Sequence, residues 1–123
     1  MTVVRVLVVD DVAAFLLAMV SVVGETPGFE VVAVASSGEE AVAAAAEVLP
    51  DLVLMDVNLP RIDGLEATRR LLRGSPVPTV LLLSTYDDDV GEQLVAESGA
   101  AAYLHKAALG PDRLQQAWSD ARR

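Results

Sequence analysis

Five short apolar segments alternate with five helix-length segments along the chain, and this alternation restricts the possible folds more than any other feature of the sequence. The apolar segments are rich in valine and leucine and predict buried strands at 3–9, 30–36, 51–56, 79–84 and 101–106. The segments that follow them predict helices at 12–24, 37–49, 64–74, 87–99 and 110–123. Strands that are apolar along their whole length, each followed by a helix, indicate a parallel sheet covered on both faces.

Right-handed crossovers between parallel strands leave few ways to arrange five such units. We expect an α/β fold of the doubly wound (βα)5 type, a flavodoxin-like three-layer sandwich whose parallel five-stranded sheet has the order 2-1-3-4-5. The 123 residues are enough for one domain, so we expect a single domain over 1–123. In this topology, ligands bind at the carboxyl ends of the first and third strands.

Polar side chains occupy the carboxyl ends of four of the predicted strands. They are Asp10 and Asp11 after the first strand, Asp56 at the end of the third, Ser84 and Thr85 at the fourth, and Lys106 at the fifth. Because the carboxyl ends of parallel strands meet at one edge of the sheet, we expect these groups to converge. One aspartate could simply begin a loop, but the whole set in register indicates a site.

The chemistry of these side chains favours a cation and a phosphoryl group. Carboxylates this close repel one another and need a compensating charge. Oxygen ligands without a histidine or cysteine cluster suit Mg²⁺, which takes one or two carboxylates together with phosphate oxygens. A carboxylate can attack phosphorus to give an aspartyl phosphate, and a lysine, a hydroxyl and a metal ion stabilise charge on the phosphoryl oxygens. Asp56 ends the central predicted strand and is the expected nucleophile.

The composition argues against several other functions. The formal net charge of -9 disfavours direct binding of nucleic acid, which needs clustered lysine and arginine. The chain has no cysteine and so forms neither a disulfide framework nor a thiolate metal site, which fits a cytoplasmic protein. The apolar run at 12–20 is too short to span a bilayer, so we expect no membrane insertion. Lys106 is the only lysine in the sequence.

Four motifs, VLVVDD, DLVLMDVNLPRIDG, LLLST and AYLHK, lie in this order at the ends of four predicted strands. Together they resemble the receiver domain of bacterial two-component response regulators, and the resemblance covers essentially the whole chain. The segments GFEVVAVASSGEEAV and STYDDDVGEQLVAESGAAAYLHK are similar to the LuxR/NarL-type subfamily, whose regulators carry a helix-turn-helix output domain. The resemblance implies a signalling switch and not an enzyme that turns over a diffusible substrate.

The resemblance assigns roles to the residues around the acidic cluster. It implies that Asp56 accepts a phosphoryl group from a histidine kinase. Asp11 would bind Mg²⁺ directly, and Asp10 would hold it partly through water. The backbone carbonyl of Asn58 and an oxygen of Asp56 would complete the protein ligands.

The resemblance also assigns roles at the ends of the fourth and fifth strands. Ser84 would be the switch hydroxyl that bonds the phosphoryl group, and Lys106 would pair with the phosphate. Tyr103 would be the switch aromatic, whose ring moves inward on activation, and strand alternation places it and Lys106 on opposite sides of the strand. Thr85 is bulkier than the small residue common at this position, and we expect it to narrow access to Asp56.

The first predicted helix indicates a contact surface, since nearly every residue from 12 to 23 is apolar and a half-exposed helix needs a polar face. Some of Phe15, Leu16, Met19 and Val23 would then face outward, and exposed apolar patches usually mark contacts. We expect a symmetric homodimer through the first and last helices. The resemblance further implies a histidine kinase as partner and a downstream DNA-binding output domain, with this chain as the N-terminal part of a longer regulator.

Three other functions stay open on the sequence alone. A haloacid-dehalogenase-like phosphatase also uses a strand-end aspartate with Mg²⁺, but it needs a second aspartate two positions on, where this chain has Asn58. A flavodoxin-like cofactor-binding protein needs a hydroxyl-rich loop where Asp10 and Asp11 stand. A degenerate receiver acts without phosphorylation, although none of the expected acidic or switch residues is missing here.

Overall fold

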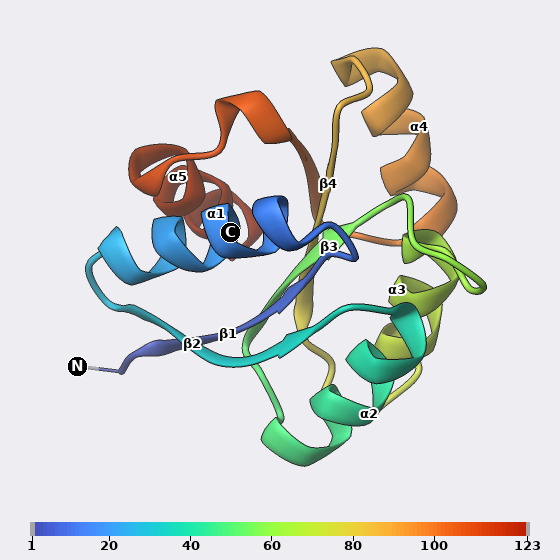
Figure 1. Ribbon diagram of the computed structural model, residues 1–123, viewed down its shortest axis with the longest axis horizontal. Helices are drawn as coiled ribbons and strands as arrows, with labels where there is room; N and C mark the ends of the chain where they lie inside the picture. Colours follow the sequence, from blue (N-terminus) through green and yellow to red (C-terminus); the bar gives the residue numbers. More distant parts are fainter. Residues whose placement is uncertain (1, 123) are drawn as a thin grey trace.

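A computed structural model describes residues 2–122 and shows a five-stranded sheet between two layers of helices (Figure 1). All neighbouring strands are parallel, and their order is β2-β1-β3-β4-β5, as predicted. In chain order the elements are β1 Val4–Val9, α1 Ala13–Glu25, β2 Phe29–Ala35, α2 Gly38–Val48, β3 Leu52–Asp56, α3 Gly64–Leu72, β4 Thr79–Ser84, α4 Asp88–Ser98, β5 Ala102–His105, the short 3-10 helix η1 Lys106–Ala108, and α5 Pro111–Ala121.

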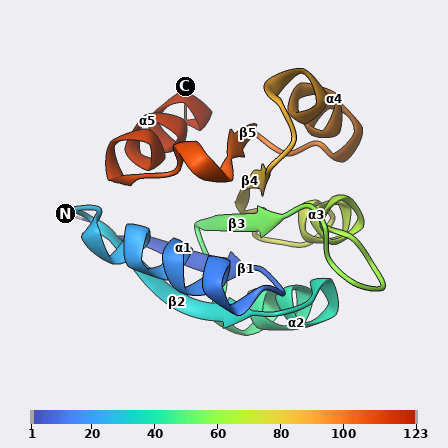
Figure 2. The same cartoon turned by 45° about the horizontal axis from the view of Figure 1, so that its top comes forward.

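The two faces of the sheet are covered by different helices. Figure 2 shows α1 and α5 on one side and α2, α3 and α4 on the other. Successive side chains of a strand point to opposite faces, so one strand supplies both layers. Val6 and Val8 of β1 join the apolar cluster under α1 and α5, whereas Leu7 and Val9 join the cluster under α2 and α3.

The central strand β3 is the most thoroughly packed element. All five of its residues are buried, and it pairs with β1 on one side and β4 on the other. Burying each aliphatic side chain contributes about 1.5–3 kcal/mol. Asp56 is the last residue of this strand, where it pairs with Leu83 of β4 directly after Met55, which still pairs with β1.

Most boundaries differ from the predicted ones by one or two residues, and a side-chain hydrogen bond accounts for two of these differences. The first helix ends at Glu25 and not at Gly24, because Thr26 provides the stop: its hydroxyl donates to the carbonyl of Val22 (2.6 Å), and Pro27 follows. The fifth strand ends at His105, so Lys106 begins the turn η1 and lies outside the strand. Among residues 2–122, no helix is both long and apolar enough to cross a bilayer.

Candidate functional site

The acidic cluster forms where β1 and β3 end side by side. Asp10 is fully buried and Asp56 is 3 % exposed, whereas Asp11 is exposed at the rim. One carboxylate oxygen from each of the three lies within 4.8 Å of the others. Oδ1 of Asp10 accepts a hydrogen bond from the backbone N–H of Val12 (2.9 Å), which fixes the turn into α1. The structure therefore brings together the three aspartates that the sequence analysis selected.

Lys106 reaches the cluster from the turn that follows β5. Its Nζ donates to Oδ2 of Asp10 (2.8 Å) and lies 3.1 Å from Oδ1 of Asp56. The turn η1 aims this side chain, because the N–H of Ala107 donates to Nδ1 of His105 (3.0 Å) as the strand ends. The lysine side chain is 10 % exposed, so it bridges the two aspartates largely shielded from water.

The charges at this edge do not balance, and the pKa values reflect this. Burial, followed by the nearby charge of Asp10, raises the pKa of Asp56 from 3.8 to about 6, although Lys106 and the backbone N–H of Asn58 oppose the rise. Burial alone would lower the pKa of Lys106, but its hydrogen bonds to Asp10 and Asp56 outweigh burial and raise it. Three carboxyl groups against one ammonium group form a site that favours an additional cation.

The loop after β3 approaches the start of α3 very closely, and Gly64 makes this possible. A Cβ atom at position 64 would lie 2.1 Å from the backbone oxygen of Asp56. The N–H of Gly64 donates to the carbonyl of Val57 (2.9 Å), which closes the loop. Asn58 is exposed within this loop, beside Asp56. Its role as a backbone metal ligand stays a prediction.

Ser84 is buried at the end of β4, and its Oγ accepts a hydrogen bond from the N–H of Tyr86 (3.2 Å). Thr85 is exposed between them, so it lies at the rim of the site. That the bulk of Thr85 narrows access to Asp56 stays a prediction.

Tyr86 is a residue that the sequence analysis missed. Its hydroxyl donates to Oδ1 of Asn58 (2.9 Å), and its carbonyl accepts a hydrogen bond from the hydroxyl of Tyr103 (2.6 Å). Tyr86 thus connects the loop after β3 to the aromatic residue of β5. Its position directly after the hydroxyl pair Ser84 and Thr85 was the one available signal, and it does not specify either partner.

Tyr103 lies on the α4 side of the sheet, with its ring against the backbone of α4. A Cβ atom at Gly91 would lie 2.0 Å from Cδ2 of this ring, so the glycine forms the notch in which the ring sits. The neighbouring Leu104 packs in the cluster on the α5 side. The direction of Lys106 is set by the turn η1 and not by strand alternation, since Lys106 lies beyond the strand.

Phe15 is the second residue that the sequence analysis did not assign to the site. It lies in the first turns of α1, and the Nζ of Lys106 is 4.1 Å from the centre of its ring. A cation over an aromatic face at this distance is attracted by the ring quadrupole. Phe15 therefore adds an uncharged neighbour to the ammonium group that also contacts Asp10 and Asp56.

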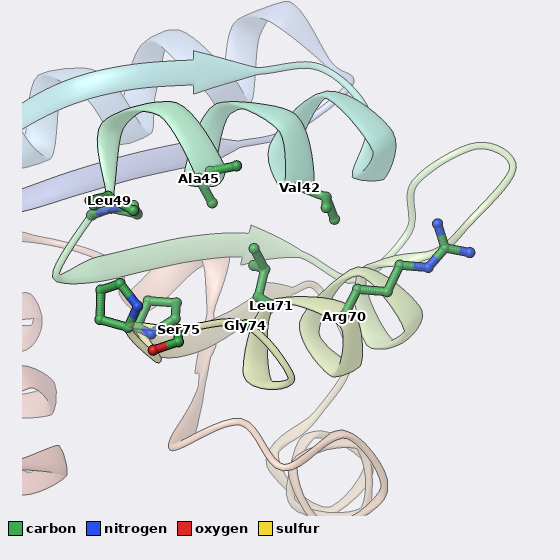
Figure 3. A pocket seen from close by; sticks show the side chains of 11 residues that line it. Val42, Ala45, Leu49, Arg70, Leu71, Gly74 and Ser75 are labelled. Carbon is green, nitrogen blue, oxygen red and sulfur yellow. The ribbon is translucent and has the colours of Figure 1, made fainter.

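A separate pocket of about 260 Å³ lies between α2, α3 and the loops that precede β3 and β4 (Figure 3). Its lining is mainly apolar, and among the described residues that line it Arg70 is the charged one. The pocket lies at the amino-terminal edge of the sheet, away from Asp56. It contributes no group to the acidic cluster.

The comparisons with known proteins agree with this geometry. The family model described as the response regulator receiver domain matches residues 6–119. The chain belongs to this family. The receiver domain is 42% identical over 105 residues to the response regulator GacA of Pseudomonas viridiflava, a match that covers 85% of this chain and 49% of that protein.

Two further proteins of different names are similar to the receiver domain. A protein-glutamate methylesterase/protein-glutamine glutaminase of Geobacter metallireducens is 42% identical over 82% of this chain and 30% of its own length. A solved two-component response regulator of the LuxR family from Aurantimonas superposes with a TM-score of 0.86 at 30% identity, covering 99% of this chain and 88% of that one. The chain spans about half the length of GacA, so the receiver is the part that they share.

Proposed function

We propose that this receiver domain is a phosphorylation-controlled switch that takes a phosphoryl group onto Asp56 from the phosphohistidine of a histidine kinase. The observation that carries the proposal is the bridge of Lys106 from Asp10 to Asp56, at the end of the central strand. Oδ1 of Asp56 meets this cation at 3.1 Å, so a phosphoryl group on Asp56 would form next to a positive charge.

The transfer would be a substitution at phosphorus. A carboxylate oxygen of Asp56 forms the O–P bond while the P–N bond to the imidazole breaks, and the imidazole nitrogen keeps the electron pair and then takes up a proton. Lys106 would move from Oδ1 of Asp56 to a phosphoryl oxygen while it keeps Asp10. The hydroxyl of Ser84, buried at the end of the adjacent strand, would bond another phosphoryl oxygen.

The donor set fits Mg²⁺, since it consists of carboxylate oxygens whose combined charge Lys106 does not balance. Asp10, Asp11 and Asp56 would hold the ion together with the backbone carbonyl of Asn58. When bound, the ion would supply positive charge toward the phosphoryl oxygens. The haloacid-dehalogenase alternative is disfavoured by the family membership and by Asn58, whose side chain is held by Tyr86 and cannot act as a general acid.

The signal would leave through α4 and β5. A phosphoryl group on Asp56 would draw Ser84 toward it and disturb the hydrogen bond that Ser84 accepts from Tyr86. Tyr86 carries the acceptor for Tyr103, whose ring lies against α4. In this proposal the altered surface controls an output domain, with transcription regulation as its function in a cytoplasmic protein and no nucleic-acid contact by the receiver itself.

We also propose a homodimer through α1 and α5. These two helices are neighbours on one side of the sheet (Figure 2). Leu17 of α1 is 69 % exposed, whereas the outward residues of α5, such as Asp112 and Arg113, are polar. An apolar centre with a polar rim is the usual anatomy of an interface.

The test is to incubate the protein with Mg²⁺ and phosphoramidate or acetyl phosphate and to measure its intact mass. We expect the mass of one added phosphoryl group, lost in Asp56→Ala and kept in Asp89→Ala, since Asp89 is an exposed residue of α4. Transfer from a phosphorylated histidine kinase should follow the same pattern.

Two outcomes would overturn the proposal. Steady hydrolysis of p-nitrophenyl phosphate that depends on Asp56 would make the protein a phosphatase. The absence of any mass gain from either donor, at any Mg²⁺ concentration, would make it a receiver that acts without phosphorylation.

A further inference from the structure

The surroundings of Phe15 set it apart from the other apolar residues of α1. Met19 and Val23 are buried in the cluster under α1 and α5, and Leu16 packs against that cluster. Phe15 belongs to neither apolar cluster of the described residues and is 41 % exposed. Its ring instead faces the Nζ of Lys106 at 4.1 Å. Phe15 thus lies outside both apolar clusters and contacts the ammonium group of Lys106.

The ammonium group of Lys106 has three hydrogens, and it contacts two carboxylates and one aromatic ring among the residues that the structure describes. Two neighbours are carboxylates, Oδ2 of Asp10 at 2.8 Å and Oδ1 of Asp56 at 3.1 Å. The third is the ring of Phe15. A third carboxylate here would add to the repulsion among the aspartates, and a cation would repel Lys106. The ring attracts the ammonium group without adding charge.

We infer that Phe15 is a positioning residue for Lys106, which it holds beside Asp56 for phosphoryl transfer; this inference rests on the proposed function. During the transfer Lys106 has to exchange Oδ1 of Asp56 for a phosphoryl oxygen while it keeps Asp10. A hydrogen bond constrains the direction of each N–H group, whereas the attraction of a ring face is much less directional. The ring therefore lets the ammonium group turn while it screens one side of it from water.

The contact itself can be observed because Lys106 is the only lysine in the sequence. A protein labelled with ¹³C at the lysine ε carbon gives one lysine ε signal in an NMR spectrum. We expect the ε protons to be shifted upfield by the ring of Phe15 in the unphosphorylated protein. Phe15→Tyr should keep this shift and Phe15→Leu should lose it. Phe29→Leu is the matched control, since Phe29 is the other phenylalanine and packs on Trp118.

The positioning role is tested by the rate at which phosphoramidate and Mg²⁺ phosphorylate Asp56. We expect Phe15→Leu to lower this rate by about three- to tenfold, which is within the range that a cation–π contact supports. Phe15→Tyr should stay within about twofold of the wild type, because a phenol ring offers a similar face. Phe29→Leu should leave the rate unchanged.

Three results would overturn the inference. An ordinary ε-proton shift in the wild type, unchanged in Phe15→Leu, would show that the ring does not lie over Lys106. A lost shift with a wild-type rate would show a contact without a positioning role. Wild-type protein that is never phosphorylated would remove the proposed function and with it the role of Phe15, while the NMR signal would still report whether the contact exists.

Discussion

The buried polar side chains of the site each fix more than one neighbour. Asp10 uses its two oxygens separately: Oδ1 accepts from Val12 at the start of α1, and Oδ2 accepts from Lys106. Lys106 in turn contacts Asp56 and the ring of Phe15. A substitution of Asp10 or Lys106 therefore changes both the charge of the cluster and the contacts of a neighbouring residue.

The titration of Asp56 should make the free energy of unfolding depend on pH. Burial and the charge of Asp10 raise its pKa from 3.8 to about 6, so the folded protein binds this proton more tightly than the unfolded chain does. The resulting stabilisation is complete below pH 3.8 and is lost as the pH rises through about 6. We expect a loss of about 2–3 kcal/mol in the free energy of unfolding across this range.

Urea unfolding in EDTA from pH 4 to 7.5 measures this loss. Asp56→Asn should abolish it and should be more stable than the wild type at pH 7, because it removes a buried charge. Asp89→Asn, which changes an exposed carboxylate, should keep the wild-type dependence. An equal slope in the wild type and Asp56→Asn would contradict the assignment.

At the scale of elements, the sequence predicted the five strands, their order and the acidic cluster, because these depend on local patterns. Apolar runs specify buried strands, and parallel connectivity then places their carboxyl ends together. The predicted end of the fifth strand was wrong by one residue, because the hydrogen bond from the N–H of Ala107 to the imidazole of His105 competes with pairing in the sheet. Such side-chain to backbone competition does not appear in hydrophobic periodicity.

The residues that the sequence could not assign make their contacts across long separations. Tyr86 meets Asn58 across 28 positions, and Phe15 meets Lys106 from a helix at the other end of the chain. An aromatic residue near a strand end or in an apolar helix has many possible partners. The choice among them is made by tertiary packing between elements that are distant in the sequence.

The effect of Gly91→Ala on the free energy of unfolding should change sign when the ring of Tyr103 is removed. In the wild type, the methyl group of Gly91→Ala would clash with the ring of Tyr103. We therefore expect a loss of about 1–3 kcal/mol in the free energy of unfolding. In the Tyr103→Ala background the ring is absent, so the same substitution should stabilise the protein by about 0.5–1 kcal/mol through helix propensity.

Denaturant unfolding of the four proteins in this cycle gives the coupling between the two positions. Effects of Gly91→Ala that are equal in both backgrounds would mean that the ring does not occupy the notch. Gly24→Ala is the matched control, because a Cβ atom there meets nothing within 4 Å and should stabilise α1 in either background.

At the scale of the whole molecule, the chemistry and the apolar surface occupy different places. The aspartates and Lys106 lie at the carboxyl edge of the sheet. The outward side of α1 instead presents the exposed Leu17, and the first turn of this helix has no acidic residue. A contact through α1 and α5 would thus leave most of the α4 and β5 surface free. The same molecule could pair with a second copy and still present the surface that Tyr103 influences.

The proposed dimer should depend on Leu17. Sedimentation velocity over a range of concentrations, with and without phosphoramidate and Mg²⁺, measures the association. We expect the wild type to dimerise and Leu17→Glu to remain monomeric, because the charge would be buried at the interface. Val77→Glu, at an exposed apolar residue before β4, should dimerise normally. Wild-type protein that is monomeric under every condition would exclude this dimer.

The complete burial of β3 has a consequence for local opening. Its amide groups are held between β1 and β4, so hydrogen exchange there should require unfolding of the whole domain. Asn58, Thr85 and Tyr86 lie on exposed loops, where opening costs far less. Asp56 therefore belongs to the slowest-exchanging part of the molecule, and the residues around it belong to the part that fluctuates. A phosphoryl group on Asp56 would be attached to a rigid strand. The exposed loops around it would change conformation in response without disturbing that strand.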